Sequence, residues 1–155
     1  MAKVIKAPET IALLPRGKSI FLAGSIEMGK AENWQEKLER YLKRFENLII
    51  FNPRRDDWDS SWVQSIDNPQ FLEQVTWELI AQEHSDIIAI YFSPGTKSPI
   101  TLPELGLFAH TGKQIVCCPE GYWRKGNIDI TCQRYEIKNV DTFDLFINEI
   151  KERLS

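Results

Sequence analysis

Short apolar runs alternate along this chain with segments of helical periodicity. The runs at residues 20–23, 48–51, 86–92 and 114–118 read as buried strands, and residues 134–137 offer a fifth. Between them, apolar side chains recur at helical spacing at residues 34–45, 71–82 and 143–154. Strands that alternate with amphipathic helices build parallel sheets. We therefore predict an α/β fold, a three-layer sandwich around a parallel sheet of about five strands.

Residues typical of helix ends indicate where two of the predicted helices begin or end. Asn68 followed by Pro69 is typical of an N-cap and first helical position, and that helix should run to about His84. A second helix should span residues 101–110, with Gly112 just past its end. Residues 1–17 show little periodicity and read as an N-terminal extension, either an edge strand or an arm. We expect residues 1–155 to form a single domain.

The composition of the chain limits the kinds of partner and the compartment that we expect for it. The net charge is −3 and no basic run exceeds two residues, which argues against a nucleic-acid polymer as the partner. No apolar stretch approaches the roughly 20 residues that span a membrane, and the first residues lack a signal peptide. Three cysteines, with Cys117 and Cys118 adjacent, indicate free thiols in a reducing cytoplasm. A redox or metal-binding pair is the less favoured alternative, because neither C-x-x-C spacing nor a nearby histidine supports it.

Glu104 is the first candidate for chemistry. It follows an apolar run and a turn-rich loop, and it falls in the opening turn of the helix at residues 101–110. Ligands of parallel sheets bind beyond the carboxyl ends of the strands, where such loops lie. A carboxylate at a helix N-terminus is favoured in its charged form, as a nucleophile on a sugar carbon requires. The alternative is a capping box, Thr101 with Glu104, in which the acid only satisfies a backbone N–H.

Glu78 is the second candidate, because it lies on the inward face of the helix that contains Phe71 and Gln82. A carboxyl near the core must be paired, protonated or functional. Partial burial would raise its pKa and suit it to act as a general acid. The alternative is a structural partner for an arginine.

Two loops complete the candidate site. Gly24 and Ser25 follow the first predicted strand, where glycine lets backbone N–H groups approach a ligand. The long loop at residues 52–62 contains Trp58, Asp59 and Trp62, which offer stacking surfaces and a carboxylate for sugar hydroxyls. A solvated loop whose tryptophans pack on the core or on a neighbouring subunit is the alternative.

The order and spacing of three pieces resemble the nucleoside 2-deoxyribosyltransferase family and its relatives, the nucleoside 5′-monophosphate N-glycosidases. They are Gly24-Ser25-Ile26, the strand ending at Phe92, and Glu104-Leu105-Gly106. The similarity covers about residues 18–130. It implies a flavodoxin-like fold.

The resemblance also implies roles for individual residues. Glu104 corresponds to the family's nucleophile, and Glu78 to the second acid, eight residues before Asp86, where the family usually has aspartate. Ser98 matches the phosphate-binding serine of the nucleotide hydrolases, whereas Glu27 replaces their phosphate-binding arginine and would repel a 5′-phosphate. Asn127 matches an asparagine that reaches the sugar 5′-hydroxyl in a neighbouring subunit's site.

The resulting hypothesis is base exchange on 2′-deoxyribonucleosides with free nucleobases, through a deoxyribosyl-glutamate intermediate. Gly24, Ser25 and Ile26 would line the site, Asp59 and Asn127 would bind sugar hydroxyls, and Trp58 or Trp62 would stack on the base. No metal or organic cofactor is expected, and a homodimer or higher homo-oligomer would share its sites. The alternatives are an N-glycosidase, in which water replaces the second base, and a non-catalytic nucleotide-binding module.

Overall fold

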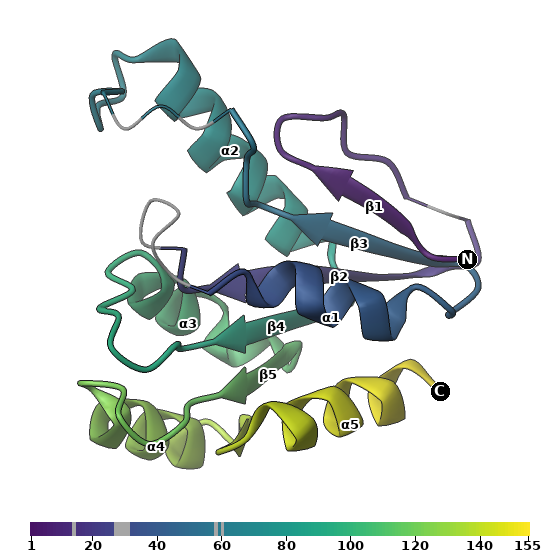
Figure 1. Cartoon of the computed structure of the whole chain (residues 1–155), viewed down its shortest axis with the longest axis vertical. Coiled ribbons are helices and arrows are strands. Elements are labelled where there is room, and N and C mark those ends of the chain that lie inside the picture. Colours follow the sequence, from purple (N-terminus) through teal and green to yellow (C-terminus); the bar gives the residue numbers. More distant parts are fainter. Residues whose placement is uncertain (14, 27–31, 58, 60) are drawn as a thin grey trace.

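The computed structural model describes residues 1–13, 15–26, 32–57, 59 and 61–155. Within them, six strands form one sheet in which every neighbouring pair is parallel, in the order β1-β3-β2-β4-β5-β6 (Figure 1). The strands are β1 (Lys3–Lys6), β2 (Lys18–Gly24), β3 (Leu48–Asn52), β4 (Ile87–Tyr91), β5 (Gln114–Cys117) and β6 (Lys138–Val140).

Leaving β1 aside, this is the flavodoxin-like order 2-1-3-4-5. The strand order reverses between β2 and β4, and ligands of such sheets bind beyond the carboxyl ends of the strands at this switch point. The predicted parallel α/β fold is confirmed, with six strands instead of about five. The additional strand is β1, which pairs with β3, so the edge-strand alternative for the N-terminal segment is confirmed.

Helices cover both faces of the sheet. Helices α1 (Trp34–Leu42) and α5 (Phe143–Leu154) pack on one face, and α2 (Pro69–His84), α3 (Thr101–Phe108) and α4 (Lys125–Arg134) pack on the other (Figure 1). Side chains of β2 alternate between the two cores: Ile20 and Leu22 point to the first, Phe21 and Ala23 to the second. The structure is thus the predicted three-layer sandwich. In the described part of the chain, no helix has both the length and the apolar character that crossing a membrane requires.

The predicted start of α2 and the predicted end of α3 are confirmed. The Asn68 side chain caps α2 by accepting hydrogen bonds from the backbone N–H groups of Gln70 and Phe71 (3.1 and 3.3 Å), and Pro69 is the first helical residue. Helix α3 continues into a 3₁₀ turn, Ala109–Thr111, and ends at Gly112 in the left-handed region with φ 73°.

The strand predicted at residues 134–137 is wrong. These residues end α4, a helix that the sequence reading did not foresee, and the last strand is β6, the three residues that follow. Glu136 has a positive φ of 55°, and the N–H of Ile137 donates to the carbonyl of Cys132 (2.8 Å), which closes the helix end. The residues predicted as a strand therefore belong to the end of a helix and the turn after it.

Candidate active site

The carboxyl ends of β2 and β4 lie side by side at the switch point. Gly24 ends β2 with φ 143°, and a Cβ at this position would lie 2.3 Å from the carbonyl oxygen of Tyr91 and 2.8 Å from the Trp34 ring. Only glycine fits such a close approach. The N–H of the next residue, Ser25, donates to the same Tyr91 carbonyl (3.0 Å), so the two strand ends are fastened together.

Three hydroxyl groups join the end of β2 to the loop between β4 and α3. The Ser25 Oγ shares hydrogen bonds with Thr96 Oγ1 (2.8 Å) and with Ser98 Oγ, and it accepts one from the backbone N–H of Ser93 (2.9 Å). Ser25 and Ser98 are both buried. The hydroxyl of Ser98, predicted as a possible phosphate ligand, therefore bonds within the protein and helps to hold the loop that precedes α3.

Glu104 lies in the first turn of α3, as predicted, but it does not cap the helix. The N-cap position is Ile100, one residue before the predicted Thr101, and no side chain makes a capping hydrogen bond there. The Glu104 carboxylate instead accepts a hydrogen bond from the side-chain amide of Gln82, on α2. The capping-box interpretation is therefore wrong.

Glu78 lies on the inward face of α2, and the Gln74 side-chain amide donates to its Oε1 (3.0 Å). No arginine or lysine of the described residues forms an ion pair with it, so the arginine-partner alternative is not what the structure contains. The inward placement expected from helical periodicity is confirmed.

Glu78 and Glu104 form one electrostatic unit. Although each residue as a whole is only partly buried, its carboxyl group is enclosed by protein. Burial raises the pKa of Glu78 to about 7 and that of Glu104 to about 8, and the nearby charge of Glu78 adds to the second rise. The hydrogen bonds from Gln74 and Gln82 act in the opposite direction. We expected the helix start to favour the charged form of Glu104, but desolvation outweighs this effect and its pKa is raised. Because the two acids interact, they titrate as a pair, and the assignment of the proton to Glu78 stays a prediction.

The interactions described for Asp59 and Trp62, in the β3–α2 loop, are made within that loop. Asp59 is exposed, and its carboxylate accepts hydrogen bonds from the backbone N–H and the hydroxyl of Ser61 (2.8 and 2.7 Å), which lower its pKa. Trp62 packs against the guanidinium group of Arg55, which lies 4.9 Å from the ring centroid. Trp58 and Glu27 lie outside the described residues, so their predicted roles stay predictions.

A second tie across the carboxyl edge involves the segment that leads into α4. The Tyr122 hydroxyl and the Trp123 indole N–H both donate to the carbonyl of Lys97, at 2.6 and 3.1 Å. This holds the β4–α3 loop against the β5–α4 loop. Asn127 is exposed in the first turn of α4 and Ile26 is half-buried after Ser25, so both stay candidates for substrate contact.

Sequence reasoning missed three polar residues of this region, which are Gln74, Gln82 and Thr96. The two glutamines lie four residues before and after Glu78, so helical spacing alone places Gln74, Glu78 and Gln82 on one face of α2.

Within the described residues, no three His, Cys, Asp or Glu side chains are grouped to hold a metal. The three cysteines are free and buried, and burial raises the pKa of each thiol to about 12, which suits inert core residues.

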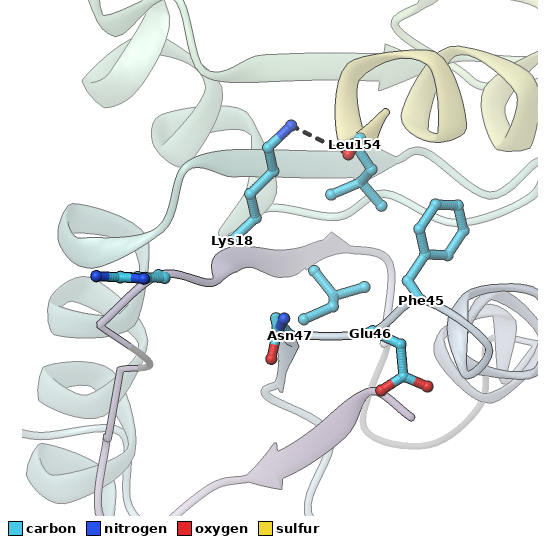
Figure 2. A pocket seen from close by; sticks show the side chains of 7 residues that line it. Lys18, Phe45, Glu46, Asn47 and Leu154 are labelled. Atoms are coloured by element: carbon cyan, nitrogen blue, oxygen red, sulfur yellow. Dashed lines mark hydrogen bonds between the residues drawn. The ribbon is translucent and has the colours of Figure 1, made fainter.

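Two surface hollows lie away from the acid pair. One of ≈ 200 Å³ lies where β2 begins, the opposite end of that strand from Gly24, and there Lys18 Nζ donates to the carbonyl of Leu154 (3.0 Å; Figure 2). The other is an open groove of ≈ 580 Å³ between residues 8–11 and α2, lined by apolar side chains such as Leu72 and Trp77. Neither is lined by Glu78 or Glu104.

Comparisons with known proteins agree with this fold. The fold is a parallel α/β sheet, and it carries two interacting carboxyl groups on α2 and α3, the kind of acid pair that glycosyl-transfer chemistry uses. The chain belongs to the family described as nucleoside 2-deoxyribosyltransferase like, which it matches over residues 17–122. This membership supports a glycosyl-transfer enzyme in general.

The fold also recurs in a solved structure, a conserved protein from Enterococcus faecalis V583. The two share 14% sequence identity with a TM-score of 0.64, and the alignment covers 89% of this chain and 99% of the other. At this identity the likeness is one of fold alone. No curated protein matches the chain.

Proposed function

We propose that this protein exchanges nucleobases on 2′-deoxyribonucleosides by double displacement. Glu104 attacks C1′ of the deoxyribose while Glu78 gives a proton to the departing base. The resulting deoxyribosyl ester on Glu104 is then attacked by a second base, which returns a proton to Glu78. Two displacements at one carbon give net retention, as in a retaining glycosidase.

The observation that carries this proposal is the pair of interacting, enclosed carboxyl groups of Glu78 on α2 and Glu104 on α3. Displacement needs one acid ionised and the other protonated at the same time. Two carboxyls with raised pKa values that interact electrostatically favour that mixed state near neutral pH, because ionising one opposes ionising the other. An isolated surface glutamate, with a pKa near 4.3, would hold no proton there.

Substrate choice follows from the residues around the pair. We propose nucleosides in preference to 5′-monophosphates, because Glu27 stands where the related hydrolases carry an arginine. The inward hydrogen bonds of Ser98 agree with this choice. The exposed Asn127 is proposed to reach the sugar of a neighbouring subunit, which would make the working form a homo-oligomer.

The test is incubation of the protein with deoxyinosine and free adenine, followed by chromatography. We expect deoxyadenosine and hypoxanthine, and no product from Glu104→Ala. That substitution removes no cap, so the variant should fold, as circular dichroism would check. Release of free deoxyribose instead would identify an N-glycosidase. A folded Glu104→Ala protein with near-normal turnover would refute the mechanism, and absence of base release from the wild type would favour a binding module.

The same incubation with deoxyinosine 5′-monophosphate as the donor tests the substrate class. We expect a much lower kcat/KM than with deoxyinosine, and an equal or higher value would contradict the role given to Glu27.

A further inference from the structure

Three polar side chains lie in a row along α2, and the middle one belongs to the acid pair. Gln74, Glu78 and Gln82 follow one another at intervals of four residues and therefore lie on one face of the helix. Both glutamines are buried, Gln82 completely. Buried amides in a helix that otherwise packs with Trp77 and Ala81 call for a physical reason, because leaving such groups without partners is costly.

The two amides are oriented in the same way. Gln82 Nε2 donates to the backbone carbonyl of Glu78 (3.3 Å) and to the carboxylate of Glu104. Gln74 Nε2 donates to the backbone carbonyl of Pro53 (3.0 Å) and to the carboxylate of Glu78. Each amide thus uses one hydrogen to anchor itself to the backbone and the other to hold an acid.

The oxygen ends of both amides are left without a partner. The Oε1 atoms of Gln74 and Gln82 are buried and accept no hydrogen bond from any described residue. An amide N–H₂ group only donates, so its contact with a carboxyl favours the ionised form. In both side chains, therefore, the described hydrogen bonds are made by the donor end of the amide.

We propose that Gln82 is a positioning residue for Glu104, which it holds from the neighbouring helix as an oriented carboxylate ready to attack. Gln74 holds the Glu78 carboxyl group in place within α2. This inference rests on the proposed function, in which Glu104 is the nucleophile. Glu78 on α2 is the charged group whose field acts on Glu104 among the described residues. Gln82 is therefore the described contact that offsets the effects of burial and of that charge.

Gln114 supplies a matched control. It is also a buried glutamine that packs against α3, and its Nε2 donates to the backbone carbonyls of Leu105 (3.1 Å) and Glu104 (3.4 Å). Its Oε1 is likewise buried without a partner. Gln114 therefore resembles Gln82 in burial and in its link to α3, but it does not contact a carboxyl group.

The experiment compares Gln82→Met with Gln114→Met in the full-length protein. The pKa of the Glu104 carboxyl is measured without substrate by NMR titration of carbon-13-labelled glutamate, assigned with Glu104→Gln. We expect Gln82→Met to raise this pKa by about one unit or more relative to the wild type, and Gln114→Met to leave it unchanged. If Gln82→Met does not fold, Gln82→Asn, which shortens the amide by one methylene, provides the same comparison.

The second measurement is the pH profile of kcat/KM for base exchange. Its acidic limb, set by ionisation of the nucleophile, should move upward by the same amount in Gln82→Met. Each unit leaves about one tenth of the activity at pH values below the limb. Equal Glu104 pKa values in the Gln82 and Gln114 variants would overturn the inference. If the wild type shows no exchange, the proposed function fails, whereas the NMR titration still decides the role of Gln82.

Discussion

Replacement of Glu104 by glutamine should stabilise the protein at alkaline pH while it removes activity. The side chains are nearly equal in shape, so the substitution tests the charge. In the folded protein the pKa of Glu104 is raised to about 8 from an ordinary value of 4.5. The folded state therefore binds more protons than the unfolded state between these two values. Stability contributed by the protonated acid is fully present below pH 4.5 and is lost as the pH rises through 8.

The size of the effect follows from the shift. Each pKa unit corresponds to about 1.4 kcal/mol, so a rise from 4.5 to about 8 sets an upper limit of roughly 4 to 5 kcal/mol above pH 8. The real effect is smaller than this limit, because the acid pair can relax and water can enter around it. We therefore expect Glu104→Gln to be about 2 kcal/mol more stable than the wild type at pH 8.5. At pH 4.5 the two proteins should differ little, since Glu104 is then protonated in the folded state.

The assay is equilibrium unfolding in urea at pH 4.5 and pH 8.5, monitored by tryptophan fluorescence. Glu120→Gln, at an exposed position, is the matched control. For each variant we take the difference between its free energy of unfolding and that of the wild type. We then compare this difference at the two pH values. If that difference for Glu104→Gln is the same at both pH values, the Glu104 carboxyl is not desolvated in the folded protein, and the argument from burial is refuted.

Two other substitutions test separate parts of the site. Glu78→Gln keeps the shape but removes the proton, so kcat should fall most for poor leaving bases and least for activated purines; unchanged rates for every base would remove Glu78 from the mechanism. Gly24→Ala should lower the free energy of unfolding by about 2 kcal/mol or more, because its Cβ would lie 2.3 Å from the Tyr91 carbonyl oxygen. A thermal melt within one degree of the wild type would contradict that.

Much of the fold could be predicted from local patterns. Helix α2 begins where Asn68 and Pro69 indicate, because an N-cap depends on residues within one turn of it. The strand predicted at residues 134–137 failed because residues 132–137 close α4 with a hydrogen bond between Ile137 and Cys132, a use of the backbone that side-chain alternation does not reveal. A short apolar run is ambiguous between strand and helix until the neighbouring elements are placed.

The candidate site shows the same division between local and long-range information. The inward direction of Glu78 is a property of one helix, and the sequence predicts it. The contact between Gln82 and Glu104 joins α2 to α3 across 22 residues, and no spacing rule foresees it. The capping-box alternative for Glu104 is also excluded. The hydroxyl bonds of Ser25 and Thr96 with Ser98 hold the loop that enters α3, and that helix takes Ile100, not Thr101, as its N-cap.

The raised pKa of Glu104 is explained by comparing the magnitudes of two opposing effects. A place in the first turn of a helix stabilises a carboxylate by about 0.3 to 1 kcal/mol, which is less than one pKa unit. Enclosure by protein shifts carboxyl pKa values by several units in the opposite direction. Glu104 experiences both effects, and its raised pKa follows from the larger one. A nucleophile in this position needs donors that favour its charge, and among the described residues the Gln82 amide is the donor that reaches its carboxylate. In the proposed mechanism, the reactivity of Glu104 would therefore depend on α2 as well as on the helix that bears it.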